Sequence, residues 1–183
     1  MSRTPYTEGA WVQGDVQQAI ERGPLTDAYQ ADANRVIQEL NQLRATEIAS
    51  YLQYKQHAYM AVSMLSPGLK DDFEAHAAAE LDHADRLARR IQQLGGVPIY
   101  NPAELAAKAA DIGVHPEQAP TLTDMVIANL MLERQQIEVY TRFIRQIDDG
   151  DLVTRQLLIG ILAETEGHAA ELSDYLKLRS ETS

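Results

Sequence analysis

Four long segments of this chain repeat apolar residues at intervals of three and four, the period of an amphipathic α-helix. Turn signals separate them: Pro-Gly at 67–68, Gly-Gly at 95–96 and Asp-Asp-Gly at 148–150. The predicted helices extend over about residues 27–65, 69–94, 123–147 and 151–178. Helices of this length, joined by a short, a long and a short connection, predict an all-α four-helix bundle with one long crossover.

The crossover between the second and third helices, residues 95–123, is too long for a connection without structure of its own. Within it, Asn101 can cap a helix, Pro102 suits the first helical position, and good helix formers follow. We therefore expect a short extra helix there. Residues 1–25 are expected to form an N-terminal arm, and residues 26–180 a single four-helix-bundle domain.

The composition excludes several classes of function. The chain has 16 Lys and Arg against 27 Asp and Glu, a net charge of -11, so it should attract cations and repel nucleic acid and anionic membranes. It has no cysteine, which excludes disulfides, thiolate metal sites and iron–sulfur clusters. No segment approaches the roughly 18 apolar residues of a membrane span, and no secretory signal is visible. We therefore expect a cytoplasmic protein.

Each apolar stripe is interrupted by a polar residue that should face the core. These residues are Glu47, Glu80, Glu133 and His168, and His83 follows Glu80 by one helical turn. Carboxylates are rarely buried unless they are paired or bind a metal. Several carboxylates with one imidazole per ion suit a centre of two metal ions, with iron or manganese favoured and zinc able to compete.

Other side chains lie near this predicted centre. Tyr54 and Tyr140 follow Glu47 and Glu133 by seven residues, which is two turns, so each shares the face of its glutamate. We expect them to support the carboxylates or to take part in redox chemistry. His76 shares the face of Glu80 and is expected to have a supporting role or to lie where metal enters. His57 and His115 are expected to be ordinary surface or interface histidines.

Several motifs resemble those of the ferritin-like superfamily. The run from Leu43 to Tyr54 resembles the first-helix signature of bacterioferritins, and the run from Glu80 to Arg86 resembles the second. Leu132-Glu133 and Glu166-Gly167-His168 are similar to the third and fourth. The resemblance implies a ferroxidase centre within one subunit that oxidises ferrous iron with dioxygen or hydrogen peroxide, for iron storage and detoxification. Its implied metal ligands are Glu47, Glu80, His83, Glu133 and His168.

The chain departs from the family at three points. Thr165 stands where the family has a bridging glutamate; Glu164, one turn before His168, is the candidate to replace it as a metal ligand, whereas Glu166 should point outward. Leu81 stands where bacterioferritins have their haem methionine, so no haem is expected. The sequence ends without the fifth helix of cages with twenty-four subunits, so we expect a closed cage of twelve, as in Dps-like proteins. Because the arm is not basic, DNA binding is not expected.

Two other functions are compatible with these residues. One is a peroxidase like rubrerythrin or manganese catalase, although the cysteine-rich segment of rubrerythrin is absent. The other is a non-catalytic structural cage whose metal site has been lost through Thr165.

Overall fold

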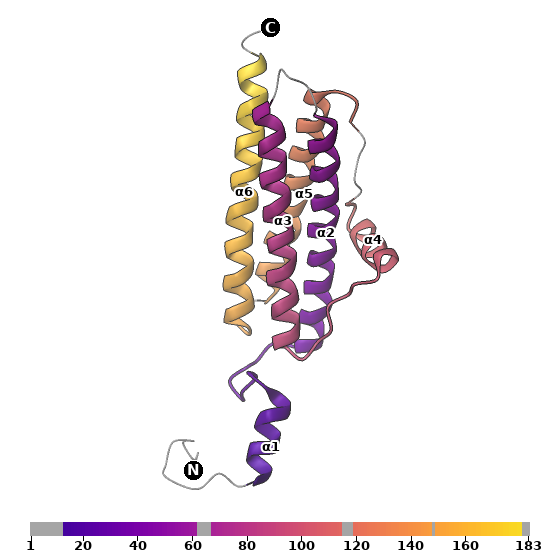
Figure 1. Cartoon of the computed structure of the whole chain (residues 1–183). Helices are drawn as coiled ribbons and strands as arrows, with labels where there is room; N and C mark the ends of the chain where they lie inside the picture. Colours follow the sequence, from indigo (N-terminus) through magenta and orange to yellow (C-terminus); the bar gives the residue numbers. More distant parts are fainter. Residues whose placement is uncertain (1–12, 62–66, 115–118, 148, 181–183) are drawn as a thin grey trace.

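The computed structural model describes residues 13–61, 67–114, 119–147 and 149–180. In this part of the chain the secondary structure is α-helical, with α1 (Gln13–Arg22), α2 (Ala33–Met60), α3 (Pro67–Gln93), α4 (Pro102–Asp111), α5 (Leu122–Ile147) and α6 (Leu152–Ser180). Helices α2, α3, α5 and α6 lie side by side, α4 lies against α2, and α1 lies beyond one end of the bundle (Figure 1). The predicted four-helix bundle with a crossover helix is confirmed.

The starts of two helices follow from their capping residues. The Asp32 carboxylate accepts hydrogen bonds from the amides of Asn34 and Arg35, so α2 begins at Ala33, six residues later than the sequence pattern predicted. Asn101 accepts from the amide of Ala103, with Pro102 at the first helical position, as expected for the crossover helix. Residues 1–12 lie outside the described residues, so the N-terminal arm remains a prediction.

Of the three apolar clusters in the described residues, two contain residues of all four long helices. One includes Leu40, Leu87, Phe143 and Ile161, and the other includes Tyr54, Phe73, Val126 and Leu172. Along the four long helices the buried residues of the two clusters are separated by about three to four turns, and this interval contains most of the polar core residues. The apolar clusters therefore hold a polar layer between them and exclude water from both sides.

A buried ion pair joins α3 to the start of α6. The guanidinium of Arg90 lies 2.8 Å and 3.0 Å from the two carboxylate oxygens of Asp151, and its Nε donates to the Thr154 hydroxyl at 2.7 Å. Asp151 also accepts from the amide of Thr154 and thus caps α6. Tyr29, in the segment before α2, donates to the same carboxylate. No helix in the described residues is long and apolar enough to cross a bilayer.

Candidate metal centre

The polar layer contains two groups of side chains that could each hold a metal ion. One consists of Glu47, Glu80 and His83, and the other of His76, Glu133 and His168. Within each group, one potential ligand atom per residue lies within 4.8 Å of the others. The five ligands that the resemblance implied are therefore brought together from α2, α3, α5 and α6. All but His168 are fully buried, and His168 is largely so.

Tyrosines hold the two outer glutamates across the bundle. The Tyr140 hydroxyl donates to Glu47 at 2.6 Å, and the Tyr54 hydroxyl donates to Glu133 at 2.5 Å. Burial and the neighbouring carboxylates raise the pKa of both tyrosines well above the usual value, so both hydroxyls stay protonated. The sequence placed each tyrosine near the glutamate of its own helix, whereas each supports the glutamate of the opposite helix.

Gln136, which the sequence analysis did not single out, lies in the middle of the layer. Its amide nitrogen donates to Glu47 at 3.0 Å and to Glu80 at 3.2 Å. Gln136 lies one turn after Glu133 on the same face of α5, and this spacing could have identified it from the sequence as a residue of the centre. A neutral amide at this position orients both carboxylates without adding charge.

Glu164 lies outside both groups. Its carboxylate is 3.0 Å from Nε2 of His83 and accepts a hydrogen bond from Arg86 at 2.8 Å, and its side chain is about half exposed. Burial raises the pKa of Glu164, but the hydrogen bonds from Arg86 and His83 lower it by more than burial raises it. The pKa of Glu164 therefore lies below its usual value. The inward position on α6 belongs to Thr165, whose hydroxyl donates to the backbone carbonyl of Ile161. Glu164 thus orients His83 from the outer side.

The inner atoms of the layer lack hydrogen-bond partners among the described residues. These atoms are Oε1 of Glu80, Oε2 of Glu133, Oε1 of Gln136, and Nδ1 of His76 and of His168. Nδ1 of His168 is 3.4 Å from carboxylate oxygens of both Glu80 and Glu133. Buried polar atoms without partners are rare in folded proteins, and a cation is one of the few groups that satisfies carboxylate oxygens and imidazole nitrogens together. The donor set therefore fits divalent iron, manganese or zinc.

Without a metal, protons balance the charge of the layer. Burial, and then the charge of Glu47, raises the pKa of Glu80 to about 7. Burial lowers the pKa of His83, but Glu47 outweighs it and the pKa rises to about 9. In the same way the carboxylates of Glu133 and Glu80 raise the pKa of His168 to about 10. Because metal ligands must be deprotonated, an ion that binds here displaces these protons.

Two histidines outside the implied ligand set are buried in the bundle. His76 was expected to support the centre, and it belongs to one of the two ligand groups. His57 was expected to be an ordinary surface or interface histidine, but it is fully buried inside the bundle, with Nδ1 2.9 Å from the side-chain oxygen of Asn129. That prediction was wrong because the buried face of α2 is wider than its apolar stripe and also contacts α5 through polar residues. His115 lies outside the described residues.

Comparison with known proteins gives matches over most of the chain. Residues 37–180 match the ferritin-like domain family. The bacterial ferritin of Pseudomonas aeruginosa is 32% identical over 145 residues, which is 78% of this chain and 87% of that protein. The nutrient stress-induced DNA-binding protein of Nostoc sp. is 31% identical over 146 residues, 77% of each chain.

A solved structure agrees with these matches. The dodecameric thioferritin of Bacteroides fragilis, a bacterioferritin-related protein, superimposes with a TM-score of 0.78 and 28% identity. The match covers 84% of this chain and 90% of that one. Since the family match extends over more than half of the sequence and over all four long helices, the chain belongs to the ferritin-like family.

Proposed function

We propose that this protein oxidises ferrous iron at the polar layer, with dioxygen or hydrogen peroxide as oxidant, and stores the product. Glu47 and His83 would bind one ferrous ion, Glu133 and His168 the second, and Glu80 would lie between them. The observation that carries this proposal is the group of buried oxygen and nitrogen atoms without hydrogen-bond partners that lie close together inside the bundle. Iron is here a substrate, and manganese or zinc could compete for the same atoms.

The electron balance requires two ferrous ions per oxidant molecule. Each ferrous ion gives up one electron, and two electrons with two protons convert hydrogen peroxide to two molecules of water, or dioxygen to hydrogen peroxide. The histidines of the layer hold protons in the metal-free state and release them when iron binds. Tyr54 and Tyr140 stay protonated and keep Glu133 and Glu47 oriented toward the ions. A redox role for either tyrosine is a further part of the proposal.

The direct test is anaerobic titration with ferrous iron followed by addition of oxidant. We expect about two ferrous ions to bind per subunit. Addition of dioxygen, or of hydrogen peroxide in a separate experiment, should then produce the absorbance of ferric iron. Iron that stays with the protein afterwards supports storage, whereas repeated consumption of peroxide without retained iron would favour the peroxidase alternative. Protein that binds no ferrous iron at all would contradict the proposal and favour the non-catalytic cage.

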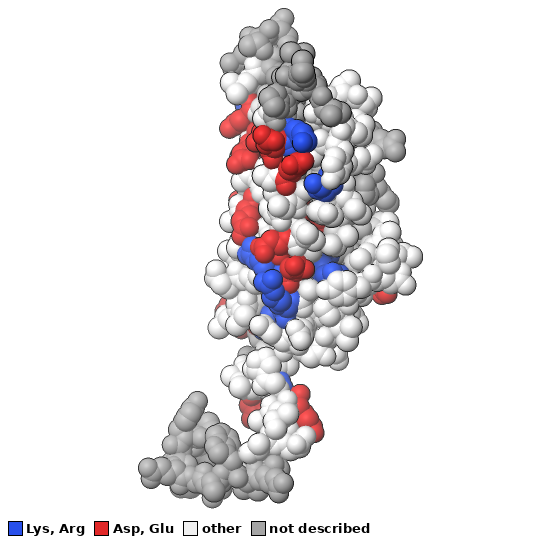
Figure 2. Space-filling view, viewed as in Figure 1, with Lys and Arg blue, Asp and Glu red and all other residues white. Residues whose placement is uncertain are grey.

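We further propose that the chain assembles into a closed homo-oligomeric cage, more readily of twelve subunits than of twenty-four. The thioferritin of Bacteroides fragilis is dodecameric, and storage of a mineral requires an enclosed cavity. Acidic side chains gather in patches on the face formed by α6, α3 and α2 (Figure 2), and a net charge of -11 draws cations toward such surfaces. Light scattering should give a mass near twelve times 20.4 kDa. If the protein is a monomer or a dimer, the proposed storage of iron is contradicted and only the proposed oxidation of iron remains.

Four of the relatives carry names that refer to DNA, but this chain's charge opposes such a role. The Nostoc protein is named as DNA-binding, and a Halobacterium salinarum relative as a DNA protection protein. Non-specific DNA binding depends on lysine and arginine contacts to phosphates. With 27 acidic against 16 basic residues, this chain is proposed to act on iron without binding DNA.

A further inference from the structure

Two histidines of α3 make the same contact with α6. His76 and His83 are seven residues apart, and so are Glu164 and Glu171. In each pair the imidazole Nε2 lies 3.0 Å from a carboxylate oxygen, His83 with Glu164 and His76 with Glu171. Seven residues are about two helical turns, so both pairs lie on one seam between the two helices, about 10 Å apart. The repeat indicates that the two histidines are positioned in the same way.

The inner nitrogens of the two rings differ in what they contact. Nδ1 of His83 lies 3.1 Å from Glu47, whereas Nδ1 of His76 is buried and has no hydrogen-bond partner among the described residues. A carboxylate on Nε2 favours the tautomer with its proton there, which leaves the lone pair of Nδ1 free for a metal. The side chain of His76 is 7% exposed, so water does not readily satisfy this nitrogen.

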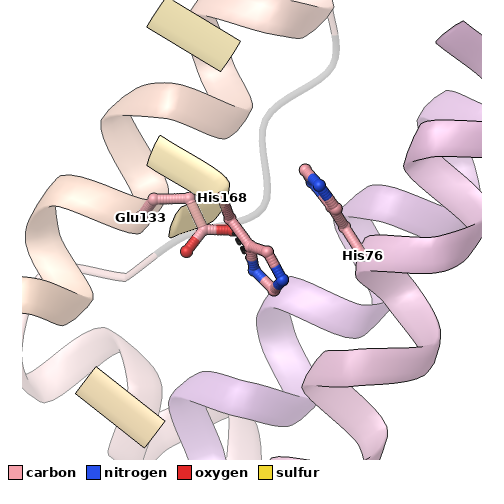
Figure 3. A group of neighbouring side chains, drawn as sticks. All are labelled: His76, Glu133 and His168. Carbon is pink, nitrogen blue, oxygen red and sulfur yellow. Dashed lines mark ion pairs between the residues drawn. The ribbon is translucent and has the colours of Figure 1, made fainter. Parts of the chain in front are cut away.

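Two aromatic contacts fix the ring of His76. It stacks on His168 with the ring centres 4.2 Å apart and 21° between the planes, and Tyr54 meets it edge-on at 5.2 Å. Figure 3 shows His168 between Glu133 of α5 and His76 of α3. The ring is therefore held on three sides, by Glu171 of α6, by His168 and by Tyr54, within the second ligand group.

We propose that His76 is a ligand of the second iron position through Nδ1, and that Glu171 positions it as Glu164 positions His83. The inference rests on the proposed function and deepens it. His76 would supply the donor that is missing at Thr165, where the side chain bonds to its own helix backbone. The second position would then have two imidazoles and Glu133, with Glu80 shared, and the first would have Glu47, Glu80 and His83.

His76 would replace the donor that is missing at Thr165, but it would not replace the negative charge of a glutamate. A set of two histidines and one carboxylate is well suited to ferrous iron and other late divalent ions, and poorly suited to magnesium or calcium. Because the two positions have different ligands and different charge, ions are expected to bind in two separate steps. The second step should depend on His76 and the first should not.

Cobalt(II) is a suitable probe because it binds such ligands and its visible absorption reports the coordination, without turnover by the oxidant. We expect two equivalents per subunit in the unmodified protein. In His76→Ala the first equivalent should keep its affinity, and the second should weaken by more than the roughly 10–100-fold that loss of an outer partner costs. Glu171→Gln should weaken the second step by about tenfold, and should have no further effect once His76 is removed.

His57→Ala is the matched control, because it removes another fully buried imidazole that lies outside both ligand groups. It should leave both equivalents unchanged. Two equivalents of unchanged affinity in His76→Ala would overturn the assignment of His76 and leave the proposed centre intact. Failure of the unmodified protein to bind cobalt or ferrous iron would instead overturn the proposed function.

Crystals of the unmodified protein with cobalt decide the question if His76→Ala does not fold. Anomalous density at about 2.1 Å from Nδ1 of His76, the usual metal–imidazole distance for zinc, supports the inference. Bound cobalt with no ion at bonding distance from that nitrogen overturns it.

Discussion

Replacement of Glu80 and His83 together by alanine is expected to abolish rapid oxidation of ferrous iron. Glu80 reaches both ligand groups: it belongs to the first, and its carboxylate lies 3.4 Å from His168 of the second. At an effective dielectric constant near 20, a unit charge about 3 Å from an ion contributes of order 5 kcal/mol per unit of ion charge before desolvation. Loss of a shared carboxylate and one imidazole should therefore lower the initial rate by at least about 100-fold, since loss of an outer partner alone costs 10–100-fold.

The double variant should still fold, because Glu80 is a buried acid whose pKa is raised to about 7 and whose ionised form opposes burial. Circular dichroism should report an unchanged helix content. Asp82→Ala is the matched control: it removes an exposed carboxylate from the same turn of α3 and should keep the full rate. An unchanged ferric absorbance rate in the double variant would show that iron is oxidised elsewhere.

Arg90→Ala is expected to lower the free energy of unfolding of the metal-free protein by about 3–5 kcal/mol, the usual cost of removing one partner of a buried ion pair. The Asp151 side chain is 1% exposed and would lose both contacts with the guanidinium. The same carboxylate caps α6 through Thr154, so the loss affects the turn between α5 and α6. Chemical denaturation followed by circular dichroism measures the difference.

The effect of Arg90→Ala should depend on pH. Burial raises the pKa of Asp151, but hydrogen bonds from Thr154 and Arg90 outweigh it, so the pKa lies below 3.8. A carboxyl group with a lowered pKa stabilises the fold above its unfolded-state pKa, and this contribution is lost as the pH falls through the folded value. The penalty should therefore be full near neutral pH and shrink as the pH falls below 3.8. Arg89→Ala, an exposed neighbour, should change stability by less than about 0.5 kcal/mol; an equal loss in both variants would contradict the ion-pair argument.

The sequence alone predicted the architecture and the main residues of the candidate centre. Apolar residues at intervals of three and four predicted four long helices, and Asn101-Pro102 predicted the crossover helix. Glu47, Glu80 and Glu133 stood out because a carboxylate on a core-facing stripe needs compensation. Both inferences depend on helical periodicity, which is a local property of the chain.

Only the tertiary structure decided which partner each inward face meets. Helical periodicity gives the direction of a side chain about its own axis, but the neighbour in that direction depends on how the helices rotate and cross when they pack. For this reason the sequence did not reveal that Tyr54 supports Glu133, that Glu164 lies behind His83, or that His76 joins Glu133 and His168 in one ligand group. The beginning of α2 was likewise decided by the contacts of Asp32, since Asp27 is an equally good capping residue by type.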